Sequence, residues 1–218
     1  MPRILTPGDI AEFRSRLCDV AARLFAELGH EGFNMRELAK RLGVSAMTPY
    51  RYFEDKNAIL TEVRSRAFAR LADWLEDALA GEDADMTTLI HAYAQFAVQE
   101  QIQYRLMFDL AQPQSQGAAA VQEQRLRTIL VGYAGTLGGR GLLGGDPEEL
   151  GLMLWTGLHG VAGLYLAGKI SSGDFHKVLS AGIRLIQDDA RAAPAGFPLH
   201  AAPSWLSAPA AFQPLAGE

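Results

Sequence analysis

Apolar residues recur at the three- and four-residue spacing of an α-helix along almost the whole chain, and no stretch sustains the alternation of a strand. This pattern predicts an all-α fold. The first expected helix, residues 9–28, has one apolar face and ends at Gly29. That face consists of Ile10, Phe13, Leu17, Val20, Leu24 and Leu28. Further helices are expected at about 34–43, 46–52, 56–80, 87–100, 102–110, 118–137, 147–169 and 174–190.

Two of these helices are short and are joined by "LGVS", which is the layout of a helix-turn-helix. Asn34 is suited to cap the first helix, where Ala39 leaves room for a crossing helix. Gly43 supplies the turn because glycine adopts a positive φ at little cost. We expect Val44 to fill the core between the helices and Ser45 to cap the second.

A proline lies inside the second short helix, in "MTPYRYF". Pro49 is only four residues past the expected cap, so its missing N–H costs little there. On a helix over 46–52 we expect Phe53 to point inward, with Met47 or Tyr50 near it. The outward-facing positions are then Thr48, Pro49, Arg51 and Tyr52.

That exposed set has the chemistry of a DNA-reading helix. Thr48 can meet a base edge or a thymine methyl group, and Pro49 offers an apolar contact. Tyrosine hydroxyls can donate to phosphate oxygens, and Lys56 is aimed at the DNA backbone. Arg36 can add a phosphate or base contact. A plain three-helix bundle with solvated basic residues is the alternative.

Charge distribution modifies this picture only slightly. The net charge of the chain is −5, but residues 1–58 carry nine Lys and Arg against eight Asp and Glu, about +1, and the remainder carries eleven against seventeen, −6. The single cysteine, Cys18, excludes an internal disulfide and is expected to be a buried, inert thiol. The N-terminus lacks a signal-peptide layout, so we expect a cytoplasmic protein.

Residues 150–168 are nineteen without a formal charge, close to the length of a membrane span. Their glycines and central histidine favour a helix buried on all sides, in the core or at a subunit interface, and no membrane partner is expected. A stripe of small residues would let another helix approach closely. It consists of Thr156, Gly160, Gly163 and Ala167.

The second half of the chain offers a candidate apolar pocket. Trp155 and His159 share a helix face, and His159 is either a core residue bonded to a carbonyl or a polar anchor for a ligand. The candidate site residues are Tyr93, Phe96, Tyr104, Phe108, Tyr133, Trp155 and His159, and Met107, Met153 and Tyr165 could line the same apolar cavity. Core packing accounts for each of them singly just as well. Neither a catalytic arrangement nor metal-ligand spacing occurs, so we expect no enzyme, no metal site and no cofactor.

The stretch "GHEGFNMRELAKRLGVSAMTPYRYFEDKNAIL", residues 29–60, resembles the DNA-binding domain of TetR-type transcriptional regulators without gaps. It departs from the family pattern at Pro49, where a leucine often precedes the first tyrosine. "QYRLMFD" and "LWTGLHGVAGLYLAG" resemble the TetR C-terminal type named for its Trp, His and Gly. The resemblance implies DNA-contact roles for Arg36, Ser45, Ala46, Thr48, Tyr50, Tyr52 and Lys56.

The resemblance also implies an organisation and a function. It divides the chain into a DNA-binding domain over 10–58, with its helix-turn-helix at about 34–53, a helical ligand-binding and dimerisation domain over 59–191, and a Pro/Ala-rich tail over 192–218. The expected protein is a homodimeric repressor, released from a palindromic operator on double-stranded DNA by a small apolar ligand. The alternatives are an activator or ligand-independent regulator, or a helical small-molecule-binding or interaction module that has lost DNA binding.

Overall fold

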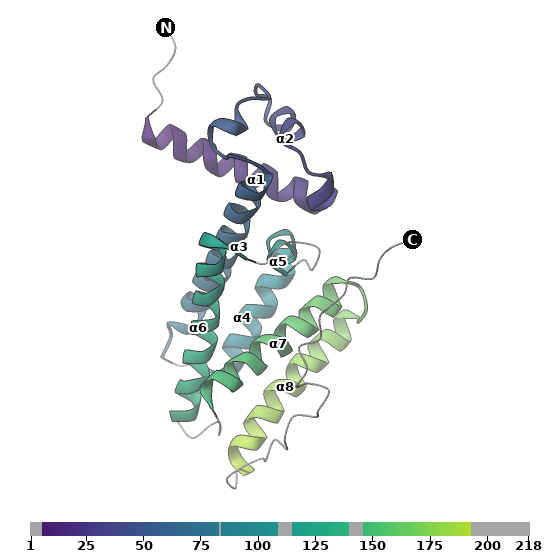
Figure 1. Ribbon diagram of the computed structural model, residues 1–218. Coiled ribbons are helices and arrows are strands. Elements are labelled where there is room, and N and C mark those ends of the chain that lie inside the picture. The colour runs from purple at the N-terminus through teal and green to yellow at the C-terminus, as the bar shows by residue number, and fades with distance from the viewer. Residues whose placement is uncertain (1–5, 83, 109–114, 140–145, 193–218) are drawn as a thin grey trace, which may run out of the picture.

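The computed structural model describes residues 6–82, 84–108, 115–139 and 146–192, and these are all-α, as predicted (Figure 1). Eight α-helices and one 3-10 turn, η1, make up this part of the chain. They are α1 (Pro7–Gly32), α2 (Met35–Leu42), η1 (Pro49–Arg51), α3 (Lys56–Leu79), α4 (Met86–Gln99), α5 (Gln101–Phe108), α6 (Gly117–Gly139), α7 (Pro147–Leu166) and α8 (Ser172–Ala192). The predicted tail lies outside the described residues beyond Ala192.

Local side-chain chemistry sets several helix ends. Thr6 and Asp9 form a reciprocal capping box at the start of α1. The backbone leaves the helical region at Gly29, with φ 68° and ψ 176°, so the long helix kinks where the sequence predicted its end. Asn34 caps α2 by accepting from the Glu37 amide, and Asp146 caps α7 by accepting from the Glu148 amide.

The described residues form two apolar cores, and helix α3 runs from one into the other. The first, here called the head core, is built from α1, α2, the start of α3 and the buried residues Phe33 and Phe53. The second, the body core, contains residues of α3 to α8. Helix α3 contributes as far as Val63 to the head core and from Ala67 onward to the body core. Figure 1 shows α1 lying across the upper end of α3, which runs down into the body.

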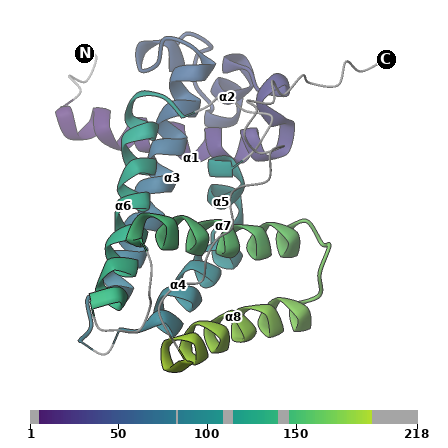
Figure 2. The same cartoon turned by 60° about the horizontal axis from the view of Figure 1, so that its bottom comes forward.

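Helices α7 and α8 lie side by side at one side of the body in both views (Figures 1 and 2). The helix expected to be buried on all sides is buried on one face only in this chain. Gly151, Leu158, Val161 and Ala162 are buried, whereas Leu152, Met153 and Leu164 are exposed. Among the described residues no helix is long and apolar enough to cross a membrane.

Cys18 lies in the head core with 2% of its surface exposed. Burial raises the pKa of its thiol to about 11, so the reactive thiolate is scarce at neutral pH. The structure therefore agrees with the prediction that Cys18 is a buried, unreactive thiol.

Candidate functional site

The turn between α2 and the following segment has the predicted geometry. Gly43 adopts φ 68° and ψ 32°, in the left-handed region. Its amide bonds the Ala39 and Lys40 carbonyls, and the Val44 amide donates to the Ala39 carbonyl at 3.0 Å. Ala39 is buried beneath this turn. Val44 is only half-buried, so it fills the core less than predicted.

Residues 45–52, here called the recognition segment, do not form the α-helix predicted for 46–52. Only the single 3-10 turn η1 is present there. Pro49 has no N–H to donate to the Ser45 carbonyl, and the Thr48 amide takes that carbonyl instead, at 2.8 Å. The Arg51 and Tyr52 amides repeat the three-residue spacing at 3.1 and 3.0 Å. The proline therefore changes the type of helix rather than being absorbed by an α-helix.

The predicted orientation of this segment is wrong at several positions. Pro49 is buried, so it cannot give the predicted apolar contact to DNA in this conformation. Met47, expected to pack near Phe53, is 67% exposed, and Tyr50 is 47% exposed. The turn of a 3-10 helix is narrower than that of an α-helix, and this difference rotates the side chains relative to the predicted face.

The other predicted contact residues divide into exposed and engaged ones. Tyr52 is half-buried, with its ring centroid 5.0 Å from that of Phe13. Lys56 begins α3 as predicted, and its Nζ donates to the His30 carbonyl at 3.2 Å. Thr48 is half-exposed. The exposed members are Arg36, Ser45, Ala46, Tyr50 and Arg51.

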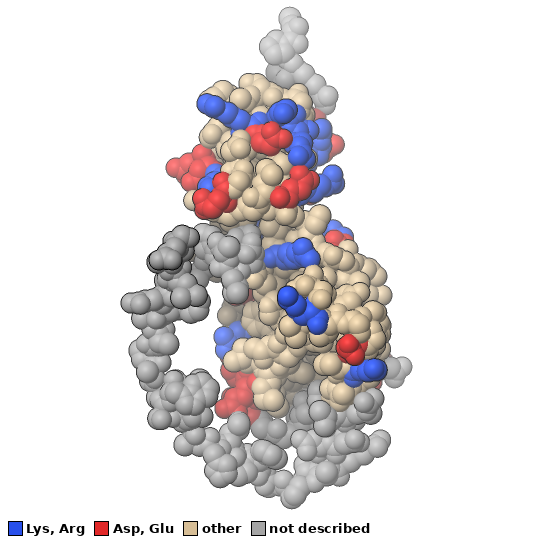
Figure 3. Space-filling view, turned by 90° about the vertical axis from the view of Figure 1, so that its right-hand side faces the viewer, with Lys and Arg blue, Asp and Glu red and all other residues tan. Residues whose placement is uncertain are grey.

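Charges on the head are mixed, and several are already paired. Arg41 binds Glu27 and Glu37, at 3.0 and 3.2 Å. Figure 3 shows Lys and Arg side chains gathered on the head among Asp and Glu side chains, above a body face that is mostly uncharged. The head is therefore not uniformly basic, but it presents exposed basic side chains such as Arg36 and Arg51.

The aromatic residues predicted to line a pocket form a packed cluster in the body core. The Tyr93 and Tyr104 hydroxyls are 3.2 Å apart, and the Tyr104 hydroxyl lies 2.8 Å from His159 Nδ1. The Phe108 ring centroid is 4.2 Å from that of His159 and 6.3 Å from that of Trp155. His159 is thus bonded to a hydroxyl, which neither sequence interpretation anticipated.

Burial controls the ionisation of this cluster. It lowers the pKa of His159 and raises the pKa of both Tyr93 and Tyr104. The imidazole is therefore neutral at neutral pH and can accept a hydrogen bond from the Tyr104 hydroxyl. Phe96 is also buried, with its ring 6.0 Å from that of Trp74, and Tyr133 is half-buried against the same core.

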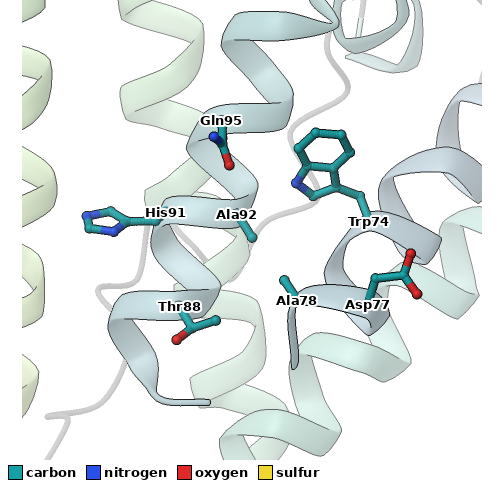
Figure 4. A pocket seen from close by; sticks show the side chains of 7 residues that line it. All are labelled: Trp74, Asp77, Ala78, Thr88, His91, Ala92 and Gln95. Atoms are coloured by element: carbon teal, nitrogen blue, oxygen red, sulfur yellow. The ribbon is translucent and has the colours of Figure 1, made fainter. Parts of the chain in front are cut away.

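Two cavities stand out elsewhere among the described residues. None of the seven candidate site residues borders either of them, but Met153, which was also predicted to line a cavity, borders the smaller one. The larger, about 490 Å³, is an open groove between α3 and α4. Its lining is Trp74, Asp77, Ala78, Thr88, His91, Ala92 and Gln95. Figure 4 shows that His91 and Asp77 point away from each other, so the polar groups of this groove do not converge.

The smaller cavity, about 250 Å³, lies between α4, α7 and α8 and is lined by apolar side chains and glycines. Its members are Ile90, Leu150, Met153, Leu154, Gly157, Leu158, Val161, Val178, Leu179 and Gly182. The predicted stripe of small residues on α7 does not border it, and of the residues predicted to line a cavity only Met153 does. Within the described residues, no group of three or more His, Cys, Asp or Glu is placed to hold a metal ion.

Comparisons with known proteins agree with this architecture. Residues 17–63 match a family model described as "Bacterial regulatory proteins, tetR family", and residues 86–186 match "Tetracyclin repressor-like, C-terminal domain". The second match includes Trp155, His159 and Gly160. An "HTH-type transcriptional regulator" of Staphylococcus aureus is 40% identical over 58 residues, which cover 27% of this chain and 31% of that protein. The similarity to this relative therefore spans about a third of its length.

Solved structures extend the similarity to most of the chain at the level of fold. A protein of unknown function from Rhodococcus sp. RHA1 is 24% identical with a TM-score of 0.69, covering 80% of this chain and 93% of its own. The TetR family transcriptional regulator PfmR from Thermus thermophilus is 23% identical with a TM-score of 0.63, covering 79% and 97%. Two family matches, one over the head and one over the body, together with this fold, show that the chain belongs to the TetR family of transcriptional regulators.

Proposed function

We propose that this regulator is a homodimeric repressor that binds a palindromic operator and is released from it by a small apolar ligand. The observation that carries the DNA-binding half of the proposal is the uncovered recognition segment. Met47, Tyr50 and Arg51 are exposed on it, and Arg36 at the start of α2 is exposed as well. The apolar side chain of Met47 suits a thymine methyl group, and the hydroxyl of Tyr50 suits a phosphate. The guanidinium groups of Arg36 and Arg51 suit a base edge or a phosphate.

The contact roles divide along the exposure of the residues. We assign the first four residues of the recognition segment, Ser45, Ala46, Met47 and Thr48, to bases and to the adjoining DNA backbone. Tyr50 and Arg36 are assigned to phosphates. Tyr52 and Lys56 are also assigned to phosphates. Tyr52 packs on Phe13 through its ring, so its hydroxyl would make the contact. Lys56 uses one of its three N–H donors on the His30 carbonyl, so the other two would make the contact.

An exposed apolar face on α7 and α8 supports the homodimer. Leu152, Met153 and Leu164 on α7 and Val178 on α8 are exposed. Around Gly157, Gly160, Gly163 and Gly182 nothing in the described part of this chain lies within 4 Å of where a Cβ would be. A second copy of these helices can therefore approach closely and cover the apolar cavity between them. Such a dimer would set two recognition segments about 34–36 Å apart, one DNA turn.

The aromatic cluster supports the ligand step. Phe108, Trp155 and His159 are half-buried, Phe108 lies against both other rings, and His159 is bonded to the Tyr104 hydroxyl. A small apolar molecule that opened this packing would meet aromatic walls and one polar pair. Such a ligand changes DNA affinity only as far as it binds the free and DNA-bound forms unequally.

Selection from a pool of random duplexes tests this proposal. We expect the protein to enrich a palindromic motif whose affinity falls steeply with salt, and expect a dimer by light scattering. A promoter reporter carrying that motif should then be less transcribed when the protein is present. Increased transcription would indicate an activator, and a pool with no enriched motif would indicate that the head has lost DNA binding.

A further inference from the structure

The recognition segment is held differently at its two ends. At the first end the bonds are local: the Val44 amide donates to the Ala39 carbonyl at 3.0 Å, the Met47 amide donates to Ser45 Oγ at 3.4 Å, and Thr48 makes no side-chain cap bond. At the second end, Phe53 is buried and Tyr52 packs on Phe13 of α1. One 3-10 turn is too short to hold its conformation by its own bonds. Its orientation against α1 therefore depends on the contacts at its second end.

Arg14 of α1 contacts that end at two points and is itself bound by Glu62 of α3. Its Nη1 donates to the Tyr52 carbonyl at 3.3 Å, and its Nη2 donates to Glu62 Oε2 at 3.2 Å. Its guanidinium carbon lies 4.3 Å from the Phe53 ring centroid. The Tyr52 carbonyl is at the end of the turn, where carbonyls lack helical partners and a cation is favourable.

Glu62 of α3 keeps the Arg14 guanidinium in that position. The same carboxylate accepts from Arg66 Nε at 2.9 Å, and Arg66 Nη1 donates to Ser15 Oγ at 3.1 Å. Burial alone would raise the pKa of Glu62, but the hydrogen bonds from Arg66 and Arg14 outweigh it and lower that pKa. The carboxylate is therefore charged at neutral pH and holds Arg14 against the protein.

We propose that Arg14 is a positioning residue for sequence recognition: it orients the recognition segment through the Tyr52 carbonyl, and it does not contact DNA phosphate itself. A guanidinium is required because its fork reaches two acceptors while its plane lies over an aromatic ring, which an ammonium cannot do. The inference rests on the proposed operator binding. It adds the residue that makes a single 3-10 turn rigid enough to read bases.

The first test compares Arg14→Ala with Arg66→Ala. Arg66 is the matched control, because it binds the same carboxylate and is 37% exposed against 39% for Arg14, yet does not touch the recognition segment. Affinities are measured for the selected palindromic duplex and for a scrambled duplex of the same composition, well below the melting temperature of each variant.

For Arg14→Ala we expect the ratio of the two affinities to fall at least about tenfold while the salt slope stays unchanged, and Arg14→Lys should not restore the ratio. Arg66→Ala should leave the ratio within about twofold. Two outcomes overturn the proposal: an unchanged ratio in Arg14→Ala, or a salt slope reduced by about one, which would make Arg14 a phosphate contact.

Glu62→Gln tests the role of the carboxylate. Without its charge the Arg14 side chain is free to turn toward phosphate, so affinity for the scrambled duplex should rise and the salt slope should steepen by about 0.9. An unchanged slope would show that Glu62 does not hold Arg14 back.

Amide hydrogen exchange separates this inference from the proposed function, because it needs no DNA. The Tyr52 and Phe53 amides both donate to the Pro49 carbonyl at 3.0 Å. In Arg14→Ala they should exchange at least about tenfold faster, with α4 unchanged, and equal protection would overturn the proposal. If the natural protein selects no palindrome, the proposed operator binding fails, and the exchange result still decides whether Arg14 holds the segment.

Discussion

The Tyr104 hydroxyl joins three helices of the body through two hydrogen bonds. It lies on α5 and contacts the Tyr93 hydroxyl on α4 and His159 Nδ1 on α7. Removing it by Tyr104→Phe takes one hydrogen bond each from the buried Tyr93 hydroxyl and the half-buried His159, so the free energy of unfolding should fall by about 1–3 kcal/mol. Urea denaturation measures this. Tyr50→Phe, which alters an exposed hydroxyl, should change it by less than about 0.5 kcal/mol, and an equally small effect at Tyr104 would contradict the prediction.

The ionisation of His159 makes the stability of the protein depend on pH. Burial lowers its pKa in the folded state below the ordinary 6.5, so the unfolded chain binds a proton at a higher pH than the folded one. This contribution to stability is complete above pH 6.5 and is lost as the pH falls through the folded pKa. Unfolding free energy between pH 7.5 and 5 should therefore drop more in the natural protein than in His159→Gln. Equal drops would contradict the assignment.

Individual contact residues were harder to predict than the motif that contains them. Gly43 and Asn34 act through their own backbone and near neighbours, so their roles follow from the sequence alone. Met47 is exposed and Pro49 is buried, the reverse of the prediction, because the missing N–H of Pro49 converts the expected α-helical turn to a 3-10 turn. Pro49 is the residue in the sequence that signals this change, because a proline at that position removes the first α-helical hydrogen bond.

At the scale of elements, the eight residues of α5 connect the two cores. Leu106 packs in the head core while its neighbour Met107 packs in the body core. Arg64 of α3 donates to the Met107 carbonyl at 3.1 Å, and Arg105 donates to the Leu166 carbonyl at the end of α7 at 2.8 Å. These contacts form a continuous path from α7 to the head, along which the proposed ligand step would act.

Helices α6 and α7 approach each other most tightly at Gly151. A Cβ added there would lie 2.7–2.9 Å from side-chain and backbone atoms of Val131. Gly151→Ala should therefore push the helices apart and lower the free energy of unfolding by about 1–3 kcal/mol in chemical denaturation. The control is Gly132→Ala on α6, where nothing lies within 4 Å, and there better helix propensity should raise stability by up to about 1 kcal/mol. A neutral Gly151→Ala would mean that α7 shifts without cost.

Helix order was predictable from the sequence, but the cavities were not. Periodicity and caps are local, and they place α1 to α8 within a few residues of their predicted bounds. A cavity depends on how finished helices pack, and aromatic side chains such as Phe96 and Tyr104 fill space rather than border it. The glycines at 157 and 182 lie beside a cavity for the opposite reason, since they leave space unfilled.

Across the whole molecule, charge and exposed apolar surface are distributed differently between the head and the body. Residues 1–58 carry about +1 and the rest of the chain −6, so a polyanion is repelled by the body and approaches the head. The body face seen in Figure 3 is mostly uncharged, in keeping with the exposed apolar residues of α7 and α8. One end thus suits DNA and the other suits a copy of the same chain.

The exposed apolar face of α7 and α8 is where we expect the second copy of the chain to bind. Met153 on α7 is 65% exposed and borders the apolar cavity with Val178 of α8. Met153→Asp would bury a carboxylate in the proposed interface, so it should convert the dimer to monomer at micromolar concentration in sedimentation experiments. Affinity for the full palindrome should then fall to that for a single half-site. Val121→Asp on α6, also 65% exposed, should leave the dimer intact. A natural protein that sediments as a monomer, or a Met153→Asp dimer of unchanged stability, would place the interface elsewhere.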